Sequence, residues 1–286
     1  MQTSRTCAEG RSAARRRPTS GSTRPTSSAA AGGVASTAVV TAIGCDAGGW
    51  RRVLGVDVVD TESYDSWLAF LRAIRSRGAA GGWLVVSDAH PGLVRALGEV
   101  FQGAAWQRCA VHLMRGCMRE AGSWQLRRRV GRIVSQVFRG RDAATVTAMY
   151  HAACDMLEEC CPRAAAVLEE AEPDALAYLD FPPTHWKRLR TNNVQERTNR
   201  EIKRRSRVVQ VFPSTGSLLR LAGAVMCEQD EIWQESRYFS EARINELYDD
   251  GRTRGIDGPV EWARLEAEAR KMLESGLELA DRVEAA

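Results

Sequence analysis

The sequence lacks an uninterrupted apolar run approaching the roughly 20 residues that a membrane-spanning helix needs, and it shows no secretory hydrophobic segment. It also lacks a regular cysteine framework, because its eight cysteines are unevenly spaced and Cys160 and Cys161 are adjacent. Disulfide-bonded secreted domains have more regular spacings. These absences predict a cytosolic protein with reduced thiols and no membrane partner.

Acidic residues are nearly absent from residues 1–33, which contain six arginines and one acid, Glu9, for a charge of +5. The whole chain carries +4, which leaves −1 for everything after Gly33. Residues 1–33 show no apolar periodicity, and such a segment cannot offset the entropy that it loses on ordering. We expect it to be disordered. The remaining residues of this 286-residue chain, which is 44% hydrophobic, are numerous enough to bury a core.

Apolar residues begin at Val34 and indicate two β-strands joined by a turn at residues 46–49. A helix is predicted over residues 63–77, because apolar side chains recur there at helical spacing. Its buried side is expected to contain Trp67, Phe70, Leu71 and Ile74.

A short apolar run at residues 83–86 is typical of a buried parallel strand, and Asp88 and His90 follow its carboxyl end. Open α/β sheets place their catalytic groups at that end of a strand. Pro91 suits the first turn of a helix that runs to about Phe101. Asp88 therefore has two interpretations, a catalytic carboxylate or a cap of this helix.

A further strand is predicted over residues 104–111, close to Cys109 and His112. The two-residue gap between these side chains is typical of zinc sites, but the sequence offers no convincing second pair for a four-ligand site. Residues 123–178 have a helical pattern throughout. Another helix is predicted over residues 218–233, with Leu219, Leu221, Val225, Ile232 and Trp233 packing inward.

Basic residues concentrate between Lys187 and Arg207, where nine lysines and arginines accompany two acids for a net charge of +7. A helix from Asn193 that ends before Pro213 would carry Glu196 at the head of a cationic face suited to DNA. Two simpler interpretations stay open. Asn193 and Glu196 also have the spacing of a capping box, and most charge runs are solvated surface.

The order of these elements resembles the RNase H-like fold of transposases and integrases, an α/β fold. That resemblance implies a mixed sheet with helices on both faces and an all-helical insertion before the last catalytic helix. The segments SDAHPGL, WQRCAVHLMR and HWKRLRTNNVQERTNREIKRRSRVVQVFPS, followed by Glu228 and Trp233, resemble the signature blocks of the bacterial Mutator-type transposases, a DDE family. The similarity covers Val34 to about Trp233. It implies a carboxylate triad that holds two Mg²⁺ (or Mn²⁺) ions.

The resemblance assigns the second metal-binding and catalytic carboxylate to Asp88 and the third to Glu196. Glu201 is the rival for the third, but five residues of helix rotate it roughly 140° away from Glu196. Four residues are expected to support the site: His90, Cys109, His112 and Asn193. The expected DNA contacts are Lys187, Arg188, Arg190, Arg197, Arg200, Lys203, Arg204, Arg205 and Arg207.

The first carboxylate of the triad is missing from the position that the resemblance implies. Its strand should lie ahead of Ala38, in a window represented here by residues 22–28, which contain no acid. Asp46 and Asp57 lie too late in the chain to replace it. Gly21 to Ala31 can be encoded so that another frame spells Ile-Asp-Ala-Thr-Tyr-Leu-Lys. We therefore expect residues 1–33 to be out of frame, the first strand to be missing and the chain to be inactive.

The resulting prediction is a truncated insertion-sequence transposase that acts on double-stranded DNA. It would lie in the bacterial cytoplasm at the nucleoid and be a homo-oligomer when intact. The alternatives are a non-catalytic DNA-binding fragment that interferes with an intact transposase, and a stand-alone RNase H-like nuclease. The predicted divisions are a disordered segment (1–33), the first part of the core (34–122), a helical insertion (123–185), the catalytic and DNA-contacting helices (186–234), and a peripheral charged tail (235–286).

Overall fold

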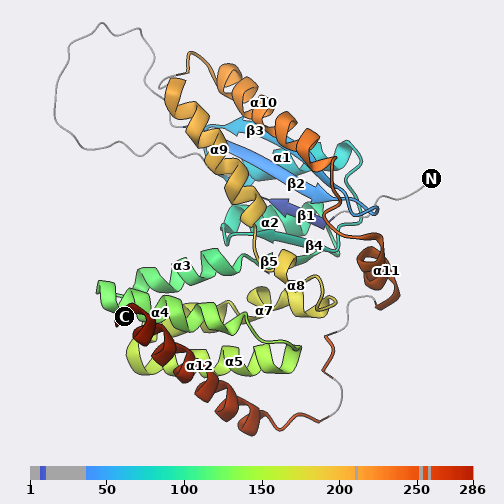
Figure 1. Cartoon of the computed structure of the whole chain (residues 1–286). Coiled ribbons are helices and arrows are strands. Elements are labelled where there is room, and N and C mark those ends of the chain that lie inside the picture. The colour runs from blue at the N-terminus through green and yellow to red at the C-terminus, as the bar shows by residue number, and fades with distance from the viewer. Residues whose placement is uncertain (1–6, 11–36, 210–211, 251–253, 257–258, 286) are drawn as a thin grey trace, which may run out of the picture. The chain divides into compact units, whose positions relative to one another are not determined.

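The computed structural model describes residues 7–10, 37–209, 212–250, 254–256 and 259–285. The chain divides into two compact units, each assembled from separate parts of the sequence (Figure 1). Unit 1 comprises Met1–Trp83, His90–Ala104 and Asn193–Phe239. Unit 2 comprises Leu84–Ala89, Ala105–Asn192 and Ser240–Ala286. The division cuts across the predicted boundaries, because the short strand before Asp88 groups with the helical insertion.

Unit 1 contains the predicted hairpin, formed by β2 (Ala38–Cys45) and β3 (Arg51–Val59) in antiparallel register. Asp46 shapes the turn, because its Oδ1 accepts hydrogen bonds from the backbone N–H groups of Gly48 and Trp50, both at 2.9 Å. Gly49 has φ of 81°, a conformation that suits glycine. The hairpin prediction is confirmed.

A short strand, β1 (Cys7–Gly10), pairs antiparallel with β2, from Cys7 opposite Cys45 to Gly10 opposite Ala42. For these four residues the expectation of disorder is wrong, whereas the window at residues 22–28, where the first strand of the family was expected, lies outside the described part of the chain. The physical reason is that a strand edge needs hydrogen-bond partners for its backbone, and any extended segment can supply them whatever its side chains. The other residues of the predicted disordered segment lie outside the described part of the chain.

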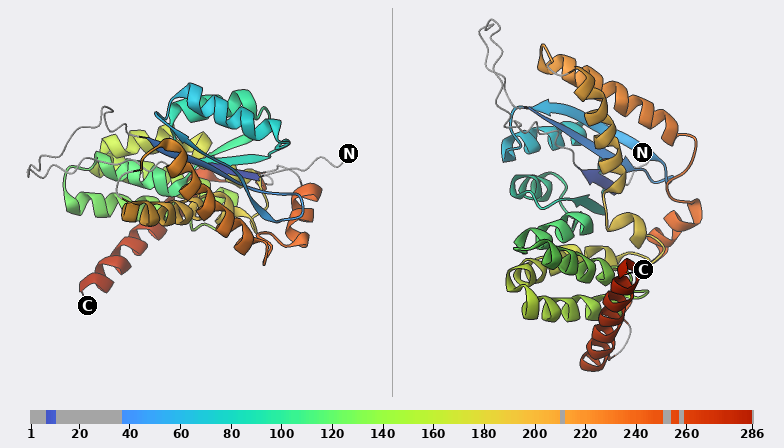
Figure 2. Two further views of the ribbon diagram at one scale, coloured as in Figure 1. Left: turned by 90° about the horizontal axis from the view of Figure 1, so that it is seen from above. Right: turned by 60° about the vertical axis from the view of Figure 1, so that its left-hand side comes forward.

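Helices pack on both sides of the hairpin of unit 1 (Figure 2). On one side lie α1 (Tyr64–Ser76) and α2 (Pro91–Val100). The four residues predicted on the buried side of α1 are all buried, so that prediction is confirmed. On the other side lie α9 (Asn193–Val209) and α10 (Thr215–Trp233).

The hydrophobic core between the hairpin, α9 and α10 fixes the position of α9. It is formed by Val39, Ile43, Ile202, Ala222, Val225, Met226 and Trp233. Val225 and Trp233 were predicted to pack inward, and they do. The same prediction is wrong for Ile232, which is 53% exposed. Adjacent side chains of a helix point about 100° apart, and at this end of α10 Trp233 takes the buried position.

Unit 2 contains two parallel strands, β4 (Leu84–Ser87) and β5 (Ala105–Arg108). The strand predicted over residues 104–111 ends early, because α3 (Ala110–Glu120) has already begun. The N–H of Ala110 donates to the carbonyl oxygen of Arg190 at 2.9 Å, which turns the chain out of the strand direction.

The predicted helical region follows α3 in unit 2. Its elements are α4 (Trp124–Val137), α5 (Ala143–Cys160), α6 (Pro162–Glu170), α7 (Glu172–Ala175), the 3₁₀ helix η1 (Ala177–Asp180) and α8 (Trp186–Leu189). Gln107 of β5 joins these helices to the strands. Its side chain is fully buried, donates to the carbonyl oxygen of Ala175 at 2.8 Å and accepts from the N–H of Tyr178 at 2.8 Å.

The charged tail forms α11 (Glu241–Asp250) and α12 (Trp262–Ala285). It was expected to be peripheral, but α12 packs on α4 and α5 and buries Leu273 completely. His151 of α5 contributes to this contact, because its Nδ1 lies 2.8 Å from Glu266 of α12 and its Nε2 lies 3.0 Å from Glu172. Among the described residues, no helix is both long and apolar enough to cross a membrane.

Candidate functional site

Asp88 directly follows β4, and β5 fixes the backbone there. The indole N–H of Trp106 donates to Ser87 Oγ at 2.8 Å, and Ser87 Oγ donates to the carbonyl oxygen of Asp88 at 2.9 Å. The N–H of Cys109 donates to the carbonyl oxygen of Ser87 at 2.7 Å. Asp88 itself is 9% exposed. A nearly buried carboxylate on a rigid strand end has the placement that metal ligands and catalytic acids require.

His90 is the N-cap residue of α2, and its Nδ1 accepts a hydrogen bond from the N–H of Leu93 at 3.3 Å. The interpretation of Asp88 as the cap of this helix is therefore wrong. The sequence predicted a supporting role for His90 at the site, and the structure shows a local role in starting α2. Its proximity to a reacting group stays a prediction.

Cys109 lies at the N-cap position of α3, and its thiol donates to Asn192 Oδ1 at 3.0 Å. Both residues are buried. The bond ties the start of α3 to the segment that precedes α9. His112 lies on α3 and is half-buried. The described residues contain no group of three or more histidine, cysteine or acidic side chains that could hold a metal, so the zinc interpretation has no support.

Glu196 lies in the first turn of α9, whose first residue is Asn193. The neighbouring Gln195 anchors this turn, because its Nε2 donates to the backbone carbonyl oxygen of Thr41 at 3.1 Å and also to the Thr41 hydroxyl. Gln195 and Thr41 are both fully buried. The start of the helix is thereby attached to β2, and Glu196 is half-buried beside the attachment.

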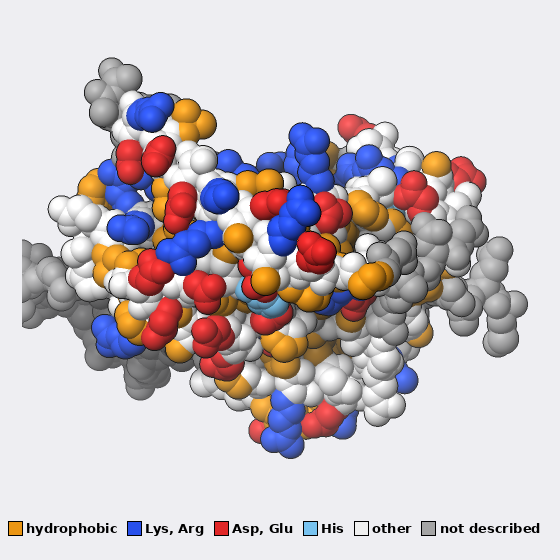
Figure 3. Space-filling model, turned by 90° about the horizontal axis from the view of Figure 1, so that it is seen from below, with side chains coloured by type: hydrophobic (Ala, Val, Ile, Leu, Met, Phe, Trp, Pro, Cys, Tyr) orange, Lys and Arg blue, Asp and Glu red, His pale blue; other side chains and the backbone are white. Residues whose placement is uncertain are grey.

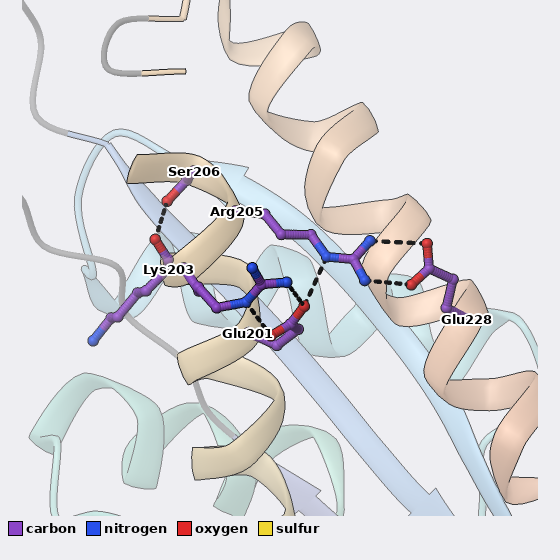
Figure 4. A network of polar contacts seen from close by, with 6 residues as sticks. Glu201, Lys203, Arg205, Ser206 and Glu228 are labelled. Carbon is purple, nitrogen blue, oxygen red and sulfur yellow. Dashed lines mark hydrogen bonds and ion pairs between the residues drawn. The ribbon is translucent and has the colours of Figure 1, made fainter. Parts of the chain in front are cut away.

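Glu201, the rival third carboxylate, is held by arginines of its own helix (Figure 4). Arg204 donates to both of its carboxylate oxygens, at 2.9 and 2.7 Å, and Arg205 Nε donates at 2.8 Å. The same Arg205 donates in a fork to Glu228 of α10, at 2.8 and 2.6 Å. The hydrogen bonds from Arg204 and Arg205 lower the pKa of Glu201 to about 2. This carboxylate already serves an ion-pair network between α9 and α10, which favours Glu196 for the site.

The predicted DNA contacts do not all lie in one unit. Lys187, Arg188 and Arg190 belong to unit 2, where Arg190 is half-buried and donates to the carbonyl oxygen of Phe138. The other six belong to α9 in unit 1. These are Arg197, Arg200, Lys203, Arg204, Arg205 and Arg207.

The ion-pair network reduces the cationic face of α9. Arg204 and Arg205 form ion pairs with Glu201 and Glu228, which neutralise part of their charge. Arg197, Arg200 and Arg207 are exposed. We define the α9 face as Arg197, Arg200, Lys203 and Arg207, of which Lys203 is half-buried. The surface shown in Figure 3 is not cationic in this way, because acidic and basic side chains are intermixed among the described residues that it shows. The described side chains on the face shown there therefore form no patch of one sign.

The two assigned carboxylates supply oxygen ligands of the kind that Mg²⁺ prefers. Asp88 lies in unit 2 and Glu196 in unit 1. The described residues contain no group of three or more acidic, histidine or cysteine side chains that could hold a metal ion. The donor chemistry therefore fits a divalent ion, but two carboxylates are fewer donors than a two-ion site requires.

Sequence reasoning missed Gln195 and Asn192, which position the site through buried hydrogen bonds. A signal for Gln195 does exist, because residues 195, 198 and 202 recur at spacings of three and four and are all buried. Asn192 gave no such signal, because its partner Cys109 lies 83 residues away.

Comparison with known proteins links the chain to one family. A model of the Mutator family of transposases matches residues 29–236. The transposase for insertion sequence element IS1081 of Mycobacterium tuberculosis is 39% identical over 213 residues, which cover 73% of this chain and 50% of that relative. The transposase for IS406 of Burkholderia multivorans is 35% identical over 208 residues, with 73% and 54% covered. The transposase for IS256 in transposon Tn4001 of Staphylococcus aureus is 32% identical over 197 residues, with 67% and 49% covered. The chain thus spans about half the length of these relatives.

Proposed function

The chain belongs to the Mutator family of transposases, and we propose that it descends from an enzyme that cleaves and joins DNA strands at the ends of an insertion sequence. The observation that carries this proposal is α9, which joins Glu196 in its first turn to the α9 face. A helix that pairs one carboxylate with several cations can bind a phosphodiester backbone beside a metal-binding group.

We further propose an RNase H-like DDE architecture. The antiparallel order of β1, β2 and β3 in unit 1 and the parallel pair β4 and β5 in unit 2 support it. Asp88 and Glu196 would hold Mg²⁺ or Mn²⁺, of which an intact site takes two. When bound, such ions activate water or a 3′-hydroxyl and stabilise the leaving oxygen. The role of the chain's own residues is to fix the two carboxylates, Asp88 through the end of β4 and Glu196 through Gln195.

The proposed partner is double-stranded DNA, bound by backbone contacts from the α9 face. The protein would work at the nucleoid in the bacterial cytoplasm, and it would be a homo-oligomer when intact. Light scattering of a purified full-length relative tests the last point, because a monomer at micromolar concentration would contradict it.

For this chain we propose DNA binding without cleavage, because residues 22–28 hold no acid where the family resemblance implies the first carboxylate. A second function follows from the same features. A chain that keeps the α9 face and lacks a full ligand set would occupy transposon ends, or join the oligomer of an intact relative, and would inhibit it. Adding the chain to an active relative should then lower strand transfer in proportion to its concentration.

The experiment that tests the DNA proposal measures binding to duplex DNA as a function of salt. Wild type should bind with a steep dependence, and the double variant Arg197→Gln/Arg200→Gln should reduce the slope of log K against log salt by about 2. A matched control is Arg264→Gln/Arg282→Gln, which removes two exposed charges from α12. The proposal fails if wild type does not bind, or if both double variants lower the slope equally.

A further inference from the structure

A second basic segment lies outside the residues considered so far. Residues 110–141, which span α3, α4 and the turn after α4, contain eight arginines and one acid, Glu120, for a net charge of +7. This equals the charge of residues 187–207, from which the DNA partner was predicted. A surface segment of this charge in a chain that sums to +4 calls for an anionic partner.

The outer face of α4 combines these charges with an exposed aromatic ring. Trp124 and Arg128 are four residues apart and share a side of the helix. The opposite side is buried through Val130, Ile133 and Val134. Trp124 is 65% exposed, and the guanidinium carbon of Arg128 lies 4.5 Å from the centre of an indole ring of Trp124.

The outer face of α3 continues the same charge. Arg115 and Arg119 are four residues apart and both are exposed, whereas Leu113 and Cys117 are buried. The next helix begins only four residues after α3 ends, and α3 packs directly on α4. We call Arg115, Arg119, Trp124 and Arg128 the α3–α4 patch.

Packing among the described residues does not explain the exposure of Trp124. A tryptophan that served the core would be buried, as Trp67 is at 1% exposure. Arg132, one turn beyond Arg128, shows the alternative, because it pairs with Asp281 of α12. Helix α12 thus contacts the C-terminal half of α4, while Trp124 at the N-terminus of α4 is exposed.

We propose that the α3–α4 patch binds single-stranded or unpaired DNA, with its guanidinium groups on phosphates and the Trp124 indole stacked on a base. The proposal rests on the proposed function, in that DNA is taken as the partner. Proteins that hold single strands combine cationic surfaces with aromatic rings, because every base has a face that can stack. A duplex hides the faces of its bases, so an exposed tryptophan beside arginines suits unpaired DNA better than paired DNA.

The test measures fluorescence anisotropy of a labelled 20-nucleotide single strand and of the matching duplex, with full-length chain. Trp124→Ala should weaken binding to the single strand by about tenfold and leave duplex binding within about twofold. Arg119→Gln/Arg128→Gln should lower the salt slope for the single strand by about 1.4, or about 0.7 for each charge removed. The control is Arg264→Gln/Arg282→Gln, which removes the same charge from exposed positions of the same unit. Trp124 is exposed, so its loss should not alter the circular dichroism spectrum.

The outcomes separate the two proposals. If wild type binds both DNAs and the α3–α4 variants bind as wild type does, this inference is wrong and the proposed function stands. If wild type binds neither DNA, the proposed function fails and this inference with it. If the α3–α4 variants lose affinity equally for the single strand, the duplex and a polyglutamate chain, the patch attracts any polyanion and the assignment to unpaired DNA is wrong.

Discussion

The attachment of α9 to β2 through Gln195 gives a prediction whose size follows from the structure. Gln195→Met keeps the length of the side chain and removes its amide. Two hydrogen bonds are lost, one to the Thr41 carbonyl oxygen and one to the Thr41 hydroxyl, and both acceptors lie in a fully buried residue. Leaving buried polar groups without partners costs about 1–3 kcal/mol.

Two details refine this magnitude. Gln195 Oε1 is buried without a hydrogen-bond partner among the described residues, so replacing the amide also removes an unsatisfied group. We therefore expect a loss of about 1–2 kcal/mol, in the lower part of that range. Thr41→Val should recover part of the loss in the double variant, because it removes the orphaned hydroxyl. The recovery should be incomplete, because the Thr41 carbonyl oxygen still lacks the hydrogen bond that Gln195 donated to it.

The assay is urea unfolding of the four proteins in the cycle, with hydrogen exchange of residues 38–45 and 193–209 as the local measurement. Faster exchange should be confined to the first turn of α9 and the facing part of β2. The reasoning is refuted if Gln195→Met unfolds at the wild-type urea concentration, or if the double variant loses the sum of the two single losses.

Ile202→Ala should lower the free energy of unfolding by about 2–5 kcal/mol, because Ile202 is 1% exposed in the core under α9, and the urea midpoint measures this. Burial lowers the pKa of His151, but the hydrogen bonds that its ring donates to Glu266 and Glu172 outweigh burial and raise the pKa above the usual value. The charged imidazole therefore stabilises the contact of α12 at low pH, and the contribution should be lost as pH rises through the raised pKa. Hydrogen exchange of α12 at pH 6 and pH 9 should show this, and His151→Gln should remove the difference. Burial raises the pKa of the Cys117 thiol to about 11, so Ellman's reagent should modify exposed Cys227 much faster, and equal rates would contradict this burial.

Local periodicity made most of unit 1 predictable. The hairpin at residues 38–59 follows from two apolar segments around a turn signal, and the buried side of α1 follows from helical spacing. Both signals depend on residues close in sequence. The start of α9 was predicted for the same reason, since Asn193 begins it and Glu196 lies in its first turn.

Features set by distant partners could not be predicted in this way. The strand over residues 104–111 ends early because Ala110 bonds to Arg190, and β1 forms because the edge of β2 needs partners. Neither event leaves a local pattern. Gln195 is an intermediate case. Its burial could be predicted from helical spacing, but its hydrogen bond could not, because its partner Thr41 lies 154 residues earlier.

The most direct test of the account incubates supercoiled plasmid carrying insertion-sequence ends with the purified chain and Mg²⁺ or Mn²⁺. The account predicts that the chain shifts the plasmid on a gel and leaves it supercoiled, with Asp88→Asn and Glu196→Gln indistinguishable from wild type in nicking. Nicking by wild type that either variant abolishes would contradict the account, because it would mean that the chain assembles a complete carboxylate site.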